Sequence, residues 1–273
     1  MVETPAEVRE HYDRDIDEGE RLRQGPGRLE LARTQEIVRR HLPAGSLRIL
    51  DVGGGTGVHA AWLADDGHQV HLVDPVDRHV EAARRLAGPG RRITAEVGDA
   101  RRLRADPDSA DAVLLLGPLY HLTDRADRLL ALREARRVVR PGGVVFAAGI
   151  SRFASLHDGL GRGFLFDPDF RTVVEGDLRD GQHRNPGRRP HWFTTAFFHH
   201  PDELRAEAAE SGFVGVEVMG VEGVAGWLGS LVDRWDDPEV REAILFAARA
   251  VENEPSVVGA SGHLLMVARR PAG

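Results

Sequence analysis

Short apolar runs alternate with amphipathic stretches between residues 47 and 150, and this alternation is the most regular pattern in the chain. Strands are predicted at 47–52, 69–73, 93–97, 112–116 and 144–148, and helices at 58–64, 77–86 and 124–139. Strands that alternate with helices in this way are joined by crossover connections, which produce a parallel sheet. The pattern predicts an α/β fold with a doubly wound, mostly parallel sheet, whose ligands bind beyond the carboxyl ends of the strands.

The flanking segments add further elements to this core. Residues 28–42 have apolar side chains at mostly helical spacing, and Pro43 and Gly45 end the pattern, so an N-terminal helix is expected. After residue 200 we expect a helix at 201–211, an alternating strand at 214–221, a long helical region at 225–252 and a final strand at 263–268.

The alternation breaks between residues 151 and 200, where glycine, proline, arginine and aromatic residues cluster. A segment of that length without periodicity is usually either functional or disordered, and its aromatic residues favour a cap over a ligand site. We therefore divide the chain into an N-terminal helical segment (1–46), a binding core (47–150), a substrate lid (151–200) and a C-terminal part of the core with a helical addition (201–273).

Composition excludes several kinds of chemistry. The chain has no cysteine, which excludes disulfides and thiolate chemistry, and all 36 of its basic residues are arginine, which excludes a Schiff-base or P-loop lysine. The formal net charge of -7 argues against nucleic acid as a partner. Because no apolar run is long enough to cross a bilayer and residues 1–10 are acidic and polar, we expect no membrane insertion and a cytoplasmic location.

A glycine-rich segment, Asp51-Val52-Gly53-Gly54-Gly55-Thr56-Gly57, directly follows the first predicted strand and precedes a predicted helix. Glycines at such a turn let the backbone approach a nucleotide-like ligand closely, although glycine turns without a ligand are also common. A dinucleotide fingerprint would have glycine or alanine at the position of Val58. The loop therefore favours a nucleotide-like ligand other than NAD.

Two further acids follow the next predicted strands. Asp74 ends the second strand, where a carboxylate can accept hydrogen bonds from ribose hydroxyls, although an ordinary surface aspartate is the competing interpretation. Asp99, in Gly98-Asp99-Ala100, follows the third strand within reach of an adenine amino group, and a helix N-cap is the alternative role. Both positions place acidic groups at the ligand-binding edge of the predicted sheet.

Taken together, these motifs resemble the class I S-adenosylmethionine-dependent methyltransferase family, of the type that acts on small molecules. The resemblance covers residues 47–150 well and rests on Asp51 to Gly57, Asp74, Gly98-Asp99-Ala100, Asp111-Ala112-Val113 and Arg140-Pro141-Gly142-Gly143. It implies a Rossmann-like fold with an antiparallel closing strand and S-adenosylmethionine as cofactor. The cofactor contacts it implies are Asp51, Gly53, Gly55, Gly57, Asp74, Asp99, Ala100 and Leu116, with Tyr12 folding over the cofactor.

Methyl transfer from a sulfonium is an in-line displacement, so alignment of the acceptor and exclusion of water are the main tasks of the protein. If the acceptor is a hydroxyl group, a general base is needed, and His121 is our first candidate because it follows the fourth strand. Tyr120 is the candidate that steers the methyl group. A helix cap or pocket wall for His121, and ordinary packing for Tyr120, are the alternatives.

The lid carries many histidines and aromatic residues, a composition suited to a planar or amphipathic small molecule. Asn185, His199 and His200 are the predicted substrate contacts. No histidine pair there has the helical spacing with an intervening acid that a catalytic metal site would show, so no metal is expected.

The sequence thus predicts methyl transfer to a small molecule, with the accepting atom (O, N or C) and the oligomeric state left open, a homodimer included. The arginine-only basic composition is in keeping with a bacterial enzyme of secondary metabolism. Two alternatives remain: a non-catalytic protein that binds S-adenosylmethionine or a partner, and an NAD-dependent oxidoreductase, which Val58 and Gly98-Asp99-Ala100 disfavour.

Overall fold

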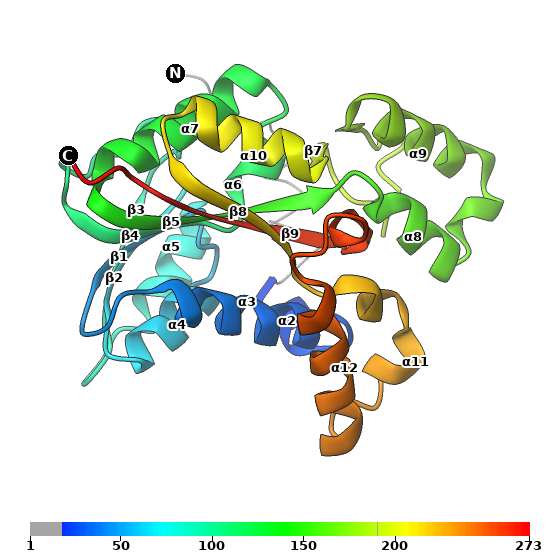
Figure 1. Ribbon diagram of the computed structural model, residues 1–273, viewed down its shortest axis with the longest axis horizontal. Coiled ribbons are helices and arrows are strands. Elements are labelled where there is room, and N and C mark those ends of the chain that lie inside the picture. Colours follow the sequence, from blue (N-terminus) through cyan, green and yellow to red (C-terminus); the bar gives the residue numbers. More distant parts are fainter. Residues whose placement is uncertain (1–17, 190) are drawn as a thin grey trace.

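A mixed, mostly parallel β-sheet forms the centre of the computed structural model, which describes residues 18–189 and 191–273 (Figure 1). Its parallel part has the order β3-β2-β1-β4-β5. These strands are β1 (Arg48–Val52), β2 (Gln69–Asp74), β3 (Arg92–Val97), β4 (Ala110–Leu115) and β5 (Val139–Ser151). β9 (His263–Arg269) pairs antiparallel with both β5 and β8 (Val214–Gly220), so the expected Rossmann-like sheet with an antiparallel closing strand is confirmed.

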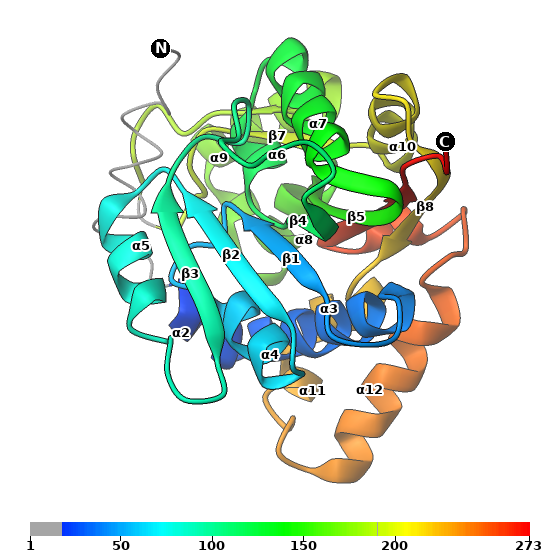
Figure 2. The same ribbon diagram turned by 90° about the vertical axis from the view of Figure 1, so that its left-hand side faces the viewer.

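Helices cover both faces of the sheet (Figures 1 and 2). On one face, apolar side chains of α3 (Gly27–His41), α4 (Val58–Asp65) and α5 (Asp77–Arg84) pack into one core cluster. On the other face, α7 (Arg125–Val138) and α10 (Pro201–Glu210) contribute to a second cluster. The predicted helices at 28–42, 58–64, 77–86, 124–139 and 201–211 correspond to these five.

Two predicted boundaries are wrong for local reasons. The strand expected at 144–148 is the longer β5, which begins at Val139, and its pairing with β4 is irregular because the register shifts between Ala110 and Ala112. The expected long helix at 225–252 is divided into η2 (Gly223–Trp227), α11 (Gly229–Val232) and α12 (Pro238–Val251). The last division arises because the Asp237 side chain caps α12 and Pro238 begins it.

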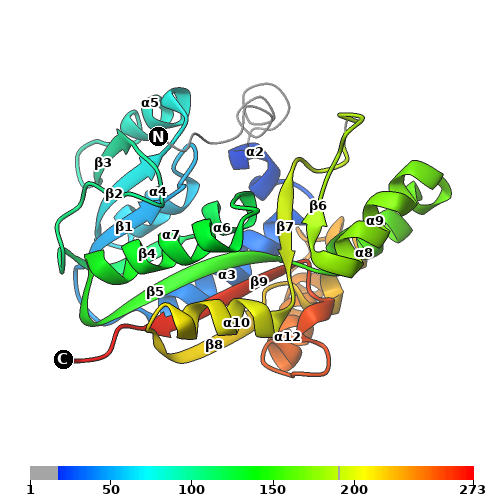
Figure 3. The same cartoon turned by 90° about the horizontal axis from the view of Figure 1, so that it is seen from above.

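The segment 151–200 is more regular than its sequence indicated. It contains α8 (Ala154–Gly161), η1 (Phe164–Phe166), α9 (Pro168–Asp180) and a short hairpin of β6 (Gln182–His183) and β7 (Ala196–His199). β7 pairs with the end of β5, and Figure 3 shows the helices α8 and α9 beyond this hairpin, away from the main sheet. Phe170, Val174 and Trp192 form a small hydrophobic cluster of this segment, which therefore packs on itself.

Short elements complete the chain. They are α2 (Glu18–Arg23), α6 (Pro118–His121) and η3 (Val258–Ala260). α3 is tied to the C-terminal part because the buried guanidinium of Arg33 donates hydrogen bonds to the Val221 carbonyl and to the Glu252 carboxylate. Within the described residues, none of the helices has both the length and the apolar character that crossing a membrane requires.

A buried ion pair joins α7 to α10. Arg128 donates hydrogen bonds to the Glu207 carboxylate at 2.8 and 3.1 Å, and its guanidinium lies 3.6 Å from the centre of the Phe197 ring. Arg128 and Glu207 are each 2% exposed. Burial raises the pKa of Glu207, but hydrogen bonds from His199 and Arg128 outweigh burial and hold the pKa below its ordinary value. The pair is a structural link between two helices on the same face of the sheet.

This link predicts a difference between two glutamates on α10. Glu207→Ala leaves the Arg128 charge buried without its partner and is expected to lower the free energy of unfolding by about 3–5 kcal/mol. Glu210→Ala removes an exposed, solvent-screened pair with Arg125 and should lower the free energy of unfolding far less. Urea unfolding of the two variants measures the difference, and equal losses would contradict the structural role of Glu207.

Candidate active site

The loop after β1 turns back on itself through glycines with positive φ angles. Gly53 has φ +68°, Gly55 +56° and Gly57 +90°, values that side-chain-bearing residues rarely adopt. A Cβ atom on Gly53 would lie 2.6 Å from a Pro118 side-chain carbon, whereas a Cβ on Gly55 would have no protein atom within 4 Å. Since Gly55 lines a cavity, its missing side chain leaves that space open to a ligand.

Asp74, at the end of β2, holds this loop in place. Its carboxylate accepts hydrogen bonds from the Gly55 and Val76 backbone amides, both at 2.9 Å, and from His79 Nδ1 at 3.0 Å. The residue is 5% exposed and lines the same cavity as Gly55. A single carboxylate therefore joins the ends of two neighbouring strands beside the cavity.

Asp51 is a second acid at this edge, and it is fully buried. Neither of its carboxylate oxygens accepts a hydrogen bond from the described residues. Burial, together with the nearby Asp74, raises the pKa of Asp51 to about 7. The Ala60 backbone amide lies near enough to offset part of this rise, although its geometry is not that of a hydrogen bond. An unsatisfied acid beside a cavity fits a ligand that carries a positive charge or hydrogen-bond donors.

Asp99 lies at the third strand end, and its carboxylate is engaged by Arg101. It accepts hydrogen bonds from the Arg101 backbone amide at 2.8 Å and from the guanidinium at 2.5 and 2.9 Å. Burial favours a higher pKa for Asp99, but the Arg101 hydrogen bonds dominate together and lower it. No helix begins at Asp99, so the carboxylate closes a turn and is not a helix N-cap.

These groups line one cavity, which we name the cofactor cavity. Of the predicted cofactor contacts, the structure brings together Asp51, Gly53, Gly55, Asp74, Asp99, Ala100 and Leu116 in its wall. Gly57 is not in the wall, because it lies at the start of α4, where a Cβ would meet Leu86 at 2.7 Å. Tyr12 lies outside the described residues. The carboxylates of this wall accept hydrogen bonds and carry negative charge, which fits S-adenosylmethionine with its hydroxyl, amino and sulfonium groups.

A larger cavity of about 940 Å³, which we name the substrate cavity, adjoins the first. Its aromatic wall residues are Tyr120, Phe170, Trp192, Phe193, Phe198 and Trp227. Most of them come from the segment 151–200, together with charged groups such as Asp158 and Arg162. The composition of the wall is compatible with a planar or amphipathic small molecule.

The three predicted substrate contacts are placed differently. Asn185 lines the substrate cavity, where its amide also donates hydrogen bonds to the Arg189 and Trp192 carbonyls. His199 is fully buried beside Glu207, where burial lowers its pKa, and it belongs to neither cavity wall. His200 is the N-cap of α10 and is also absent from both walls. Both histidines thus lie where β7 ends and α10 begins, outside the two cavity walls.

Tyr120 and His121, the predicted catalytic pair, lie on α6 directly after β4. Both line the cofactor cavity, and Tyr120 also lines the substrate cavity. The His121 ring stacks on Phe193 with 5.8 Å between ring centres, and its centre is 4.7 Å from that of Tyr120. The two residues form an aromatic wall that joins α6 to the segment 151–200.

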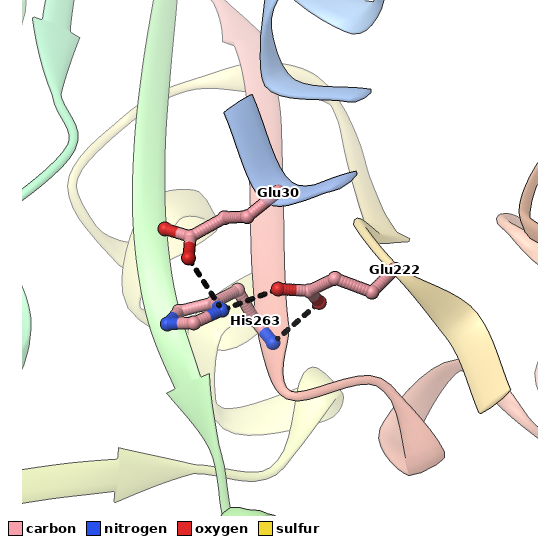
Figure 4. A group of neighbouring side chains, drawn as sticks. All are labelled: Glu30, Glu222 and His263. Carbon is pink, nitrogen blue, oxygen red and sulfur yellow. Dashed lines mark hydrogen bonds and ion pairs between the residues drawn. The ribbon is translucent and has the colours of Figure 1, made fainter. Parts of the chain in front are cut away.

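Among residues 18–189 and 191–273, three line both cavities: Glu30, Tyr120 and His263. Figure 4 shows Glu30 on α3, His263 at the start of β9 and Glu222 after β8, all pointing toward one another. His263 Nδ1 is 2.5 Å from Glu222 Oε1 and 3.6 Å from Glu30 Oε2. Glu222 also accepts a hydrogen bond from the His263 backbone amide at 3.0 Å. We name these three residues the junction triad.

The electrostatics of the junction triad favour a charged histidine. Burial alone lowers the pKa of His263, but the negative charges of Glu30 and Glu222 outweigh it and raise the value to about 9. Burial likewise opposes ionisation of Glu30, yet the Arg21 charge, with His263, lowers its pKa to about 2. Arg21, on α2, binds both Glu30 oxygens at 2.7 and 2.9 Å.

The junction triad also has one ligand atom per residue within 4.8 Å of the others, a spacing that could hold a metal ion. Arg21 already occupies both oxygens of Glu30, however, and a guanidinium beside the site repels a cation. The arrangement is therefore better suited to an imidazolium than to a divalent ion.

Sequence reasoning did not identify the junction triad. Glu30 and His263 are separated by 233 positions, and each carries an ordinary helix or strand pattern around it. The one available signal is that His263 opens the final strand among apolar residues, at a strand end where sites in such sheets are built.

Comparison with known proteins agrees with this geometry. Residues 49–143 match the family model described as a methyltransferase domain. The chain is 39% identical over 111 residues to the ubiquinone biosynthesis O-methyltransferase of Methylocella silvestris, spanning 40% of this chain and 42% of that protein. It is 42% identical over 172 residues to an S-adenosyl-L-methionine-dependent Diels-Alderase of Talaromyces variabilis, spanning 51% and 58%.

Solved structures share the fold at low sequence identity. Phosphoethanolamine N-methyltransferase 2 of Haemonchus contortus, in complex with S-adenosyl-L-methionine, aligns with a TM-score of 0.59 and 19% identity. The alignment covers 98% of this chain and 60% of that one. The chain spans about two fifths of the length of the first curated relatives it matches.

The raised pKa of His263 predicts a pH dependence of stability. Its folded-state pKa of about 9 exceeds the ordinary 6.5, so its contribution is fully present below about pH 6.5 and is lost as pH rises through 9. Between pH 8 and 10 the free energy of unfolding should fall by about 1 kcal/mol.

Urea unfolding at several pH values measures this loss. The chain has no lysine, so few other groups titrate in this range. His263→Gln should flatten the profile, whereas His71→Gln, in neither cavity wall, should retain the slope. A wild-type stability that is constant between pH 8 and 10 would refute the charged state of His263.

Proposed function

Because this chain carries a domain of the class I S-adenosylmethionine-dependent methyltransferase family, we propose that it transfers the methyl group of S-adenosylmethionine to a small planar or amphipathic acceptor. The observation that carries the proposal is the joining of two cavities at Glu30, Tyr120 and His263. One cavity has the glycine loop and its acids, and the other has an aromatic wall. A donor and an acceptor bound in the two cavities would meet at this junction.

The cofactor cavity supplies binding and orientation. Asp74 and Asp99 line the cavity, the unsatisfied Asp51 is available to polar groups of the cofactor, and the open space at Gly55 admits the cofactor close to the backbone. When bound, S-adenosylmethionine supplies an electrophilic methyl group on a sulfonium. The acidic lining of the cavity is complementary to that positive charge.

The aromatic wall of the junction aligns the acceptor and excludes water from it. Tyr120 borders both cavities, and its hydroxyl donates a hydrogen bond to the Leu116 carbonyl at 3.3 Å. Phe193 contacts Tyr120 and His121 from the segment 151–200. This segment acts as the lid over the acceptor, and a cytoplasmic small-molecule enzyme of secondary metabolism is the setting we propose for it.

One relative supports a second candidate function. The Diels-Alderase of Talaromyces variabilis has the longer of the two curated alignments, and its name assigns it a cycloaddition that depends on S-adenosyl-L-methionine. A reaction of that class in this chain would use the same two cavities but would leave the cofactor unconsumed. Release of S-adenosylhomocysteine separates the two functions.

The open space at Gly55 yields a binding prediction with a matched control. Gly55→Ala and Gly67→Ala both place a Cβ at positive φ, with no protein atom within 4 Å of either one. Only Gly55 lines the cofactor cavity, so Gly55→Ala should raise the Kd for S-adenosylhomocysteine about tenfold or more, equivalent to about 1.4 kcal/mol. Titration calorimetry measures both variants, and equal affinities would contradict the assignment of the loop.

The function itself is tested by binding followed by turnover. Calorimetry should show binding of S-adenosylmethionine and S-adenosylhomocysteine and none of NAD. Methyl-labelled cofactor incubated with substituted phenols and hydroxyquinones should then yield S-adenosylhomocysteine and a labelled product. Absence of cofactor binding would refute the proposal, and a bound cofactor that stays intact while an acceptor is converted would favour the cycloaddition.

A further inference from the structure

His263 has one ring nitrogen inside the junction triad and one outside it. Nδ1 faces Glu222 and Glu30, while Nε2 lies on the opposite edge of the ring (Figure 4). Nε2 has no hydrogen-bond partner among the described residues, and the side chain is 28% exposed at the junction of the two cavities. The free nitrogen is therefore available to a molecule bound there.

The charges around the ring favour its protonated, imidazolium form. Glu30 and Glu222 contribute two negative charges, and Arg21 contributes one positive charge through its bonds to Glu30. Among these four described residues, a neutral ring leaves a net charge of about -1, whereas an imidazolium balances it. His59, a further titratable group lining the cofactor cavity, is kept neutral because burial lowers its pKa to about 4.

The hydrogen bonds fix the ring as well as its charge. Glu222 is 5% exposed, and one of its oxygens also accepts hydrogen bonds from Ser261 Oγ at 2.7 Å and from the His263 amide at 3.0 Å. Its other oxygen binds Nδ1, so the ring orientation is set before any ligand arrives. The imidazolium consequently presents an Nε2–H donor to the junction at little further cost in ordering.

From this geometry we propose that the His263 imidazolium binds an anionic oxygen of the methyl acceptor through Nε2–H, with Glu222 as its positioning residue. The acceptor is accordingly a small aromatic or planar molecule that carries a carboxylate or phenolate. This inference rests on the proposed function, because it names the substrate class of the same site. Aromatic groups of the substrate cavity contact the ring of such a molecule while His263 holds its charged end.

The alternative role of His263, a general base, makes the opposite demand. A base must be neutral to take a proton through Nε2, whereas an anion-binding group must be charged. Affinity for an anion therefore falls as pH rises through the pKa of an imidazolium, and a base shows no such loss. The two roles therefore predict different dependences of anion affinity on pH.

Benzoate and benzamide are a suitable pair of probes, because they share shape and differ in charge. With the protein saturated with S-adenosylhomocysteine, binding is followed at pH 7.5 by NMR of ¹⁵N-labelled histidines. We expect benzoate to bind at least about tenfold more tightly than benzamide, to shift the His263 Nε2 resonance, and to lose affinity as pH rises through about 9. Benzamide affinity should not change with pH.

Three variants distinguish the contribution of His263 to benzoate binding from that of neighbouring residues. His263→Gln should reduce benzoate affinity to the level of benzamide, and Glu222→Gln should move the loss of benzoate affinity to lower pH, because one carboxylate no longer stabilises the imidazolium. His71→Gln, outside both walls, is the control. A purely structural role of Glu222 would lower affinity without moving that pH midpoint.

Equal affinities for the two probes, no benzoate binding, or benzoate affinity that rises with pH would each overturn the inference. Binding of S-adenosylhomocysteine is measured separately by calorimetry on the same sample. If the cofactor fails to bind, the proposed function fails, and the probe comparison on the cofactor-free protein still tests His263. If the cofactor binds and the probes are not distinguished, only the inference about His263 fails.

Discussion

The hydrogen bond between the Asp74 carboxylate and the Gly55 amide is the interaction on which the rest of the site depends. It joins the end of β2 to the loop after β1, and that loop can follow its path only with glycine at its positive-φ positions. This bond fixes the position of Gly55, beside which a Cβ atom would have no protein atom within 4 Å. The cofactor cavity is therefore a consequence of one carboxylate and a backbone without side chains.

Two histidine–carboxylate groups in the same chain have different consequences. His199 and Glu207 lie with Arg128 between α7, α10 and the end of β7, and His199 lines neither of the two cavities. In the junction triad, Arg21 offsets Glu30 in a similar way, but His263 lines both cavities and its Nε2 has no hydrogen-bond partner among the described residues. Only the second arrangement can act on a ligand, because only there does a charged donor remain available.

The N-terminal helices α2 and α3 supply charged side chains to the wall of the substrate cavity. Arg21 on α2 and Glu30 on α3 reach the substrate cavity, and Arg33 anchors α3 to the C-terminal part of the chain through Val221 and Glu252. The segment 151–200 closes the opposite side with its aromatic residues. The junction is thus assembled from segments that lie before, within and after the alternating strands and helices of the core.

The sequence by itself determined the parallel sheet and the glycine loop with Asp51, Asp74 and Asp99, because these depend on local periodicity and on backbone conformations that few residues tolerate. The antiparallel closing strand was expected only from the family resemblance, because periodicity does not specify strand direction. The sequence did not reveal the helices within 151–200, where packing of Phe170 and Trp192 stabilises what the local pattern left ambiguous. Only the tertiary structure decided that His199 is buried beside Glu207 and that His263 stands between Glu30 and Glu222. The physical reason is that the charge and hydrogen bonding of a histidine depend on side chains that are distant in sequence, and no local pattern specifies which of them will meet.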